Sequence, residues 1–232
     1  MKLHSFKIVN TTVLVVALML NACSGPDTSI FPLSEGYWWQ YVAVRTIRGE
    51  DHEQKLIIAN LPPMDLHGVK VYPQKRADGK MDYYEKSESA IFRLDPEDGE
   101  KTQILGLPVA IGTKWQASSK ILFLKVTGAF ESTYNRRIKE PILIDYEIVA
   151  TDELVKVKAG KFYNCIKVKG AGSLYGGGGS LKEFMDIDSI NIETEEWYAP
   201  GVGLVKRTRK EYTAPLDFQN HYQEELESVR ID

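Results

Sequence analysis

From Phe31 onward, apolar and polar residues alternate in short segments that are separated by Gly, Pro, Asp and Asn. Alternation with a period of two places the apolar side chains on one face of a strand, and these four residue types favour hairpin turns. No window longer than about ten residues carries the apolar stripe of an amphipathic helix. The pattern therefore predicts an all-β fold, in which a curved antiparallel sheet forms a sandwich or a partly open barrel.

The expected strands fall into two series. The first series comprises Tyr37–Thr46, Gln54–Leu61, Val69–Tyr72, Met81–Lys86, Ala90–Leu94 and Thr102–Leu105. The second comprises Lys120–Thr127, Ile142–Ala150, Glu153–Lys158, Phe162–Lys169, Ile192–Tyr198, Leu204–Tyr212 and His221–Val229. Part of the last segment, Glu224–Val229, is also compatible with a short terminal helix.

A nine-residue pattern, Pro-x-x-x-Gly-x-x-Trp-Gln, occurs twice in the chain. Its fixed positions are Pro32, Gly36, Trp39 and Gln40 in the first copy and Pro108, Gly112, Trp115 and Gln116 in the second. Glycine permits a positive φ at the turn, and tryptophan supplies core area where the next strand begins. We therefore expect both tryptophans to be buried. The repeat indicates two related halves, 31–105 and 106–232, although independent use of one turn solution would give the same pattern.

The N-terminus has the features of a targeting segment. Lys2 and Lys7 precede an apolar run, Val13–Leu20, which is too short to span a bilayer and is followed by Ala22 and Cys23. This arrangement resembles the bacterial lipobox, in which a small residue precedes the cysteine that receives the lipid. The resemblance implies cleavage before Cys23 and acylation of its thiol, with palmitate among the attached acyl chains. An ordinary secretory signal with an incidental cysteine is the alternative.

Cleavage at this site would divide the chain into a signal peptide at 1–22, a lipidated tether at 23–30 and an all-β domain at 31–232. Ser24 follows the lipidated cysteine, and lipoproteins of Gram-negative bacteria that lack Asp at this position are typically carried to the outer membrane. We therefore expect a lipid-anchored protein on the periplasmic side of the outer membrane.

Composition and charge argue against several classes of function. The 29 Lys and Arg residues and the 32 Asp and Glu residues give a formal net charge of -3, so a nucleic-acid partner is not expected. Two cysteines and four histidines form no common metal motif, and we expect no metal, cofactor or catalytic centre. Cys165 lies in a strand-like segment, where a core position is expected rather than a nucleophile. Glu195 and Glu196 are adjacent in a strand and should point to opposite faces.

Two hairpin motifs in the second half carry a family resemblance. Val155–Val168 contains Ala-Gly-x-Phe at Gly160 and Phe162, and Glu196–Lys206 contains Trp-Tyr-Ala-Pro-Gly-Val-Gly. The second motif supplies Trp197, Pro200, Gly201 and Gly203. Both resemble motifs of a bacterial family of TapB-like envelope proteins, which is related to a domain of unknown function. The resemblance implies an all-β lipoprotein domain and no enzymatic activity.

Basic residues flank the apolar positions of these hairpins. We expect them to stay solvated, and they are Lys156, Lys158, Lys161, Lys167, Lys206 and Arg207. A solubilising surface explains such residues, and attraction to anionic lipid headgroups is the functional alternative.

Three functional hypotheses remain. The first is a noncatalytic envelope lipoprotein that acts as an interaction or structural module and binds an unknown envelope protein. The second is a carrier of an apolar ligand or lipid, because 12 Tyr, 4 Trp and 8 Phe on a strand-rich body could line a cavity. The third is an enzyme whose site is assembled from dispersed residues.

We predict that Cys23→Ala abolishes membrane attachment. A lipid anchor contributes about 0.8 kcal/mol per buried CH₂ group, and the processed chain has no other segment apolar enough to insert. The measurement is the share of protein that stays with the membrane fraction after a high-salt wash. Ser24→Ala is the matched control, and equal membrane recovery of the Cys23→Ala variant and the wild type would contradict the prediction.

Overall fold

The computed structural model describes residues 29–47, 49–122, 141–175, 188–215 and 219–231. The expected signal peptide, Cys23, most of the expected tether and the end of the expected strand Lys120–Thr127 lie outside these residues. The described strands are β1 (Tyr37–Ile47), β2 (Glu50–Asn60), β3 (Met64–Leu66), β4 (Val69–Arg76), β5 (Met81–Lys86), β6 (Ala90–Leu94), β7 (Lys101–Gly106), β8 (Lys114–Ser119), β9 (Ile142–Val157), β10 (Gly160–Tyr175), β11 (Ser189–Ala199), β12 (Gly203–Ala214) and β13 (Gln219–Ile231).

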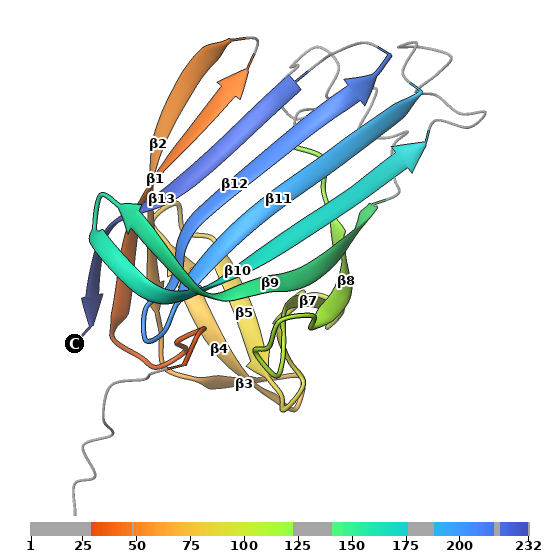
Figure 1. Ribbon diagram of the computed structural model, residues 1–232. Coiled ribbons are helices and arrows are strands. Elements are labelled where there is room, and N and C mark those ends of the chain that lie inside the picture. The colour runs from red at the N-terminus through yellow and green to blue at the C-terminus, as the bar shows by residue number, and fades with distance from the viewer. Residues whose placement is uncertain (1–28, 48, 123–140, 176–187, 216–218, 232) are drawn as a thin grey trace, which may run out of the picture.

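These 13 strands form one antiparallel sheet that curls into a nearly closed barrel (Figure 1). The strand order is β7-β6-β5-β4-β2-β1-β13-β12-β11-β10-β9-β8, and β3 pairs with β4. Pairing of β1 with β13 joins the two ends of the chain, from Tyr37 opposite Ile231 to Ile47 opposite Asn220. The edge strands are β7 and β8, and no ladder in the described chain joins them. The open seam makes the barrel partly open. The prediction of an all-β fold with a curved antiparallel sheet is therefore confirmed.

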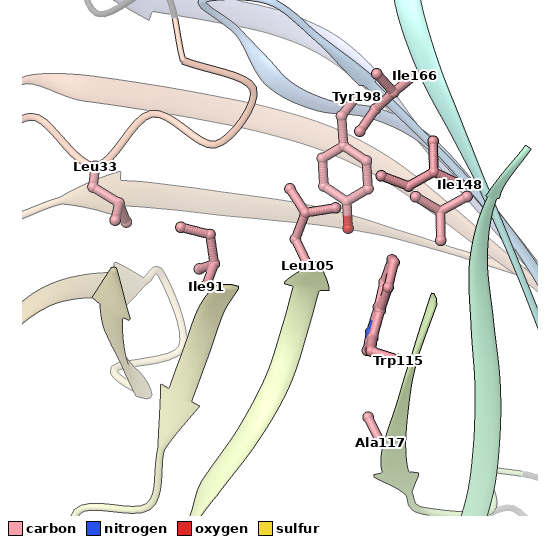
Figure 2. Close-up of a cluster of buried hydrophobic side chains, with 9 residues drawn as sticks. Leu33, Ile91, Leu105, Trp115, Ala117, Ile148, Ile166 and Tyr198 are labelled. Atoms are coloured by element: carbon pink, nitrogen blue, oxygen red, sulfur yellow. The ribbon is translucent and has the colours of Figure 1, made fainter. Parts of the chain in front are cut away.

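Side chains on the inner face of the sheet gather into an apolar cluster between the barrel walls (Figure 2). The buried members of this cluster are Leu33, Ile91, Leu105, Trp115, Ala117, Ile148, Ile166, Val168 and Tyr198. They come from β6 and β7 on one side of the seam and from β8 to β11 on the other, with Leu33 entering ahead of β1. Apolar packing therefore holds the seam together where main-chain hydrogen bonds are missing.

Trp115 closes part of the seam. A Cβ atom added to Gly106 of β7 would lie 2.9 Å from Cε3 of Trp115, so only glycine lets the indole of β8 pack this closely on β7. The other side of the indole stacks on Tyr146, with ring centroids 5.4 Å apart and an interplanar angle of 7°. Trp115 is consequently 8% exposed.

Trp39 occupies a second apolar cluster. It is 3% exposed, and its indole N–H donates to the carbonyl oxygen of Val202 at 2.7 Å. This second cluster includes Tyr37, Trp39, Tyr41, Val155, Cys165, Trp197, Ala199, Val205 and Leu226, and Phe162 and Val202 pack against it. The turn glycines that precede the two tryptophans have the same backbone conformation, with φ of 89° at Gly36 and 88° at Gly112.

The observed strands differ from the expected ones in several places, and the described residues 120–122 of the expected strand Lys120–Thr127 lie in no strand. β9 runs unbroken from Ile142 to Val157, where two strands were expected. The strand Lys114–Ser119 is in neither expected series, although the repeated motif placed the start of a strand at Trp115. The short β3 was also missed. Glu224–Val229, for which a strand and a short helix were both left open, belongs to β13. The boundary between the proposed halves, 105/106, falls just before the last residue of β7, next to the seam between β7 and β8.

We predict that Trp39→Ala and Trp115→Ala each lower the free energy of unfolding by about 3 to 5 kcal/mol, because each truncation leaves a cavity in a packed cluster. The loss is read from chemical denaturation. Tyr175→Ala is the control: this side chain is 75% exposed, so its change should stay within about 0.5 kcal/mol. Equal effects of the three substitutions would contradict the assignment of the two tryptophans to the core.

Candidate functional site

The outer face of the sheet is hollowed into an open groove of about 940 Å³, which we call the outer groove. Strands β1, β2 and β9 to β13 contribute to it. The outward-facing residues that line it are Val44, Thr46, Asp51, Asp145, Glu147, Val149, Lys169, Ala171, Glu193, Glu195, Thr208, Lys210, His221 and Gln223. Five of these carry carboxylates and two carry lysine ammonium groups, so the lining has an excess of negative charge.

Cross-strand ion pairs organise this face. Glu195 on β11 accepts Lys167 at 3.1 Å and Lys169 at 3.2 Å, both from β10. Burial alone would raise the pKa of Glu195, but hydrogen bonds from the two lysines outweigh it and hold the pKa below its ordinary value. Lys206 pairs with Glu225 at 2.8 Å on the next two strands. Each lysine thus stands beside an acid, as neighbouring strands favour.

Trp197 marks one end of these rows of charges. Its ring lies between Lys167, whose Nζ is 4.7 Å from the ring centroid, and Lys206, whose Nζ is 5.9 Å away. The indole N–H donates to a carboxylate oxygen of Glu153 at 2.6 Å. The residue is 9% exposed and belongs to the second cluster, so its polar contacts fix the ring in place rather than offer it to a ligand.

A second group of charges lies on the inner face. Arg207 of β12 stands between Glu196 of β11 and Glu224 of β13 in the strand register. Its Nε donates to Glu196 at 2.9 Å and its Nη1 donates to Glu224 at 3.3 Å. Tyr198 donates to Glu196, and Tyr222 donates to Glu224 at 3.0 Å. We call these five residues the inner ion network.

The inner ion network holds its charges in place. Burial alone would lower the pKa of Arg207, but Glu196 and Glu224 raise it above the ordinary value. Burial, and then the charge of Glu224, raises the pKa of Tyr222. The side chains of Glu196 and Glu224 are 11% and 5% exposed, and that of Arg207 is 32% exposed. The expectation that Arg207 is solvated was therefore wrong, because odd-numbered residues of this part of β12 face inward. It was also wrong for Lys167, whose side chain is only 16% exposed where it packs on Trp197.

Arg209 extends the inner charges toward the other end of β12. It donates from Nε to Glu211 at 2.8 Å and from Nη1 to the Ser119 hydroxyl at 2.8 Å. Glu211 also accepts the backbone N–H of Leu122 at 2.9 Å. These bonds tie the residues that follow β8 across the inner face to β12. They are structural links between two parts of the barrel wall.

The inner ion network gives little scope for acid and base chemistry. Each of its carboxylates already accepts a guanidinium and a phenol, and Glu195 lies on the opposite face from Glu196. No cluster of His, Cys, Asp and Glu that could hold a metal ion occurs among the described residues. Cys165 is fully buried, and burial raises the pKa of its thiol to about 11, which keeps it protonated near neutral pH.

The motif residues predicted from sequence are divided between the two clusters. Trp39, Phe162 and Trp197 meet in the second cluster, while Trp115 lies in the first. The turn positions Gly160, Gly201 and Gly203 have positive φ values of 138°, 72° and 88°. Pro200 precedes Gly201 in the β11–β12 turn. The sequence analysis predicted neither the inner ion network nor the outer groove. Alternation along β11 to β13 divides their residues between the two faces of the sheet, but it does not show which face is inside.

A small apolar pocket of about 70 Å³ lies near the seam. Ile30 and Phe31 form one side, and Ile91, Leu105 and Val109 contribute to the rest. Pockets that enclose drug-sized ligands usually measure about 300 to 1,000 Å³. This pocket is therefore too small for a lipid chain.

Comparisons with known proteins identify no family. No protein-family model matches the chain, and no curated protein matches it. Within the described residues, no helix has the length and apolar character needed to cross a membrane.

Two solved structures are similar to the chain. One is a "putative lipoprotein" of Parabacteroides distasonis, with 16% identity, a TM-score of 0.48, and coverage of 88% of this chain and 99% of that one. The other is a "putative exported protein with YmcC-like fold" of Bacteroides fragilis, with 20% identity, a TM-score of 0.40, and coverage of 86% and 98%.

We predict that Arg207→Met lowers the free energy of unfolding by about 3 to 5 kcal/mol, because it leaves two buried carboxylates without their cation. Lys206→Met, one residue away on the opposite face, is the control and should cost no more than about 1 kcal/mol. Denaturant titration of both variants gives the comparison. A loss for Arg207→Met no larger than that of the control would show that the network does not stabilise the barrel.

Proposed function

We propose that this chain is a noncatalytic lipoprotein of the bacterial envelope, anchored through Cys23 to the periplasmic side of the outer membrane. In this proposal it belongs to the TapB-like proteins that its hairpin motifs resemble. The all-β domain serves as an interaction module, and the outer groove is the surface that receives its partner.

The outer groove is the observation that carries the proposal. It spans seven strands and its lining carries five carboxylates and two lysines, whereas the apolar pocket near the seam is more than ten times smaller. A carrier of an apolar ligand needs an enclosed apolar cavity. The groove is open and charged instead, which favours a polar partner of larger size.

The N-terminal sequence supports the anchoring part of the proposal. The apolar run Val13–Leu20 followed by Ala22 and Cys23 fits lipid attachment, and the described domain begins only a few residues later. A single lipid-modified residue would hold such a domain next to the bilayer, with its groove available to other envelope components.

Site-specific photo-crosslinking in intact cells tests the interaction module. Thr208 and Gln223 face each other across β12 and β13 in the floor of the groove, and each is replaced in turn by a photoreactive residue. Lys75, an exposed residue of β4, is the control position. We expect one discrete adduct from both groove positions and none from Lys75. The absence of an adduct from the groove, or the same adduct from Lys75, would contradict the proposal.

A second experiment, on purified protein, tests the competing carrier hypothesis. Native mass spectrometry of the purified, lipid-free protein would show a copurified apolar molecule if the chain carried one. We expect the mass of the protein alone, and a stoichiometric apolar ligand would overturn the preference for an interaction module.

A further inference from the structure

The turn that joins β9 to β10 ends in an exposed surface with an unusual charge pattern. Lys156 and Lys161 stand directly opposite each other in the strand register. Leu154 and Tyr163 flank them on the same outward side, 50% and 64% exposed. We call these four residues the tip surface. Three kinds of group therefore meet there: ammonium, aromatic and aliphatic.

The inner side of the same hairpin is firmly held. Val155 and Phe162 pack in the second cluster. In the turn, the N–H of Ala159 donates to the carbonyl oxygen of Leu226 at 3.0 Å, and Lys158 pairs with Glu227. The tip surface is thus a fixed platform, because its backbone is bonded to β13.

Tyr163 lies at a bulge in β10 and faces outward. The register shifts between Phe162 and Cys165, and Asn164 has a φ of 54°, a left-handed conformation that is uncommon for residues other than glycine. Bulges of this kind re-aim side chains and recur next to functional sites. Phe162 and Cys165 remain on the buried side, while Tyr163 points away from the barrel.

The two opposed lysines differ from the other basic residues of these hairpins. Lys158, Lys167, Lys206 and Arg207 each pair with a glutamate. Neither Lys156 nor Lys161 makes an ion pair with any described residue. Like charges directly opposite each other destabilise a strand pair. On this face of β9, the acid nearest in sequence to Lys156 is Asp152, four residues earlier. Its position along the strand is not between the two lysines.

The tip surface lies on the same side of the barrel as the start of the described chain. Ser29, the first described residue, accepts a hydrogen bond at 2.9 Å from the N–H of Gly201. The adjoining Val202 packs in the same cluster as Val155 and Phe162. Figure 1 shows the β9–β10 turn on the same side of the molecule as the start of the described chain. A lipid on Cys23 would therefore bring the tip surface to the bilayer.

We propose that the tip surface is a second membrane contact, which binds the anionic headgroups of a phospholipid bilayer through Lys156 and Lys161. Tyr163 and Leu154 enter the interfacial region beside the headgroups. The inference rests on the proposed membrane attachment, but it concerns residues that contribute nothing to the anchor or the groove. Basic residues near an anionic surface attract it, and exposed aromatic residues favour the interface.

Vesicle flotation tests the contact without the anchor. The chain from residue 23 onward, carrying Cys23→Ala, is mixed at low salt with vesicles of phosphatidylglycerol and phosphatidylcholine, or with phosphatidylcholine alone. We expect binding only to the anionic vesicles, and a loss of about 30-fold in partition coefficient for Lys156→Gln combined with Lys161→Gln. Lys156→Arg combined with Lys161→Arg should retain binding, and high salt should weaken it.

The matched control replaces two exposed lysines of β4 and β5, Lys75→Gln and Lys86→Gln, and should bind like the parent chain. Equal loss in the control pair, or equal binding to both kinds of vesicle, would overturn the proposal. The melting temperature of the Lys156→Gln and Lys161→Gln variant should not fall, because a repulsive pair is removed. A fall would give the lysines a structural role and would also overturn it.

Failure here can be told from failure of the proposed function. Cys23→Ala in cells reports on the anchor, and the crosslinks from Thr208 and Gln223 report on the groove. Neither result depends on the tip surface. If photoreactive residues at Leu154 and Tyr163 crosslink to an acidic protein while the vesicles stay unbound, the tip surface contacts a protein and not a membrane.

Discussion

The pairing of β1 with β13 is the contact on which the barrel depends. It aligns 11 residues of the first strand with residues near the C-terminus, with a single irregularity between Gln40 and Tyr41. Without it, the strands before the seam and the strands after it would form two separate meanders. Because the partners are so far apart in sequence, this ladder forms only after most of the chain is ordered. Through the register of β13, it also sets the phase of alternation in β12 and β11, that is, which alternate residues face inward. It therefore decides which charges face inward.

That phase explains how the inner ion network is tolerated. A single cross-strand row carries Glu196, Arg207 and Glu224 on consecutive strands, so the cation stands between its two acids. Tyr198 and Tyr222 supply hydroxyl donors to the same carboxylates. Buried charges are costly unless they are paired and hydrogen-bonded, and here both conditions hold. A slip of one residue in β12 would place Lys206 or Thr208 inside and expose Arg207.

Local sequence predicted the strands well because each carries its own alternation and is bounded by turn residues. Met81–Lys86 and Ala90–Leu94 agree with β5 and β6, which have a polar turn at each end. Alternation did not predict Lys114–Ser119 because Lys, Gln and Ser dominate it; only the repeated motif placed the start of a strand at Trp115, and pairing with β9 forms that strand. Arg207 was misplaced for a related reason: its side follows from long-range register, which one strand cannot reveal. The groove arises from the curvature of seven strands together, so no local motif encodes it.

The distribution of charge connects the two proposed surfaces. Removing Lys2 and Lys7 with the signal peptide would take the formal net charge from -3 to -5, so the processed body as a whole would be repelled by an anionic bilayer. The outer groove contributes to that repulsion through Asp51, Asp145 and Glu193. The tip surface is the exception, since its two lysines oppose each other on the side of the barrel where the described chain begins (Figure 1). A tethered body with one attractive end and a repelled acidic groove would be oriented by these forces alone, tip toward the headgroups and groove toward the periplasm. Orientation of this kind needs no contact between the groove and the membrane, and it would leave the groove open to its partner.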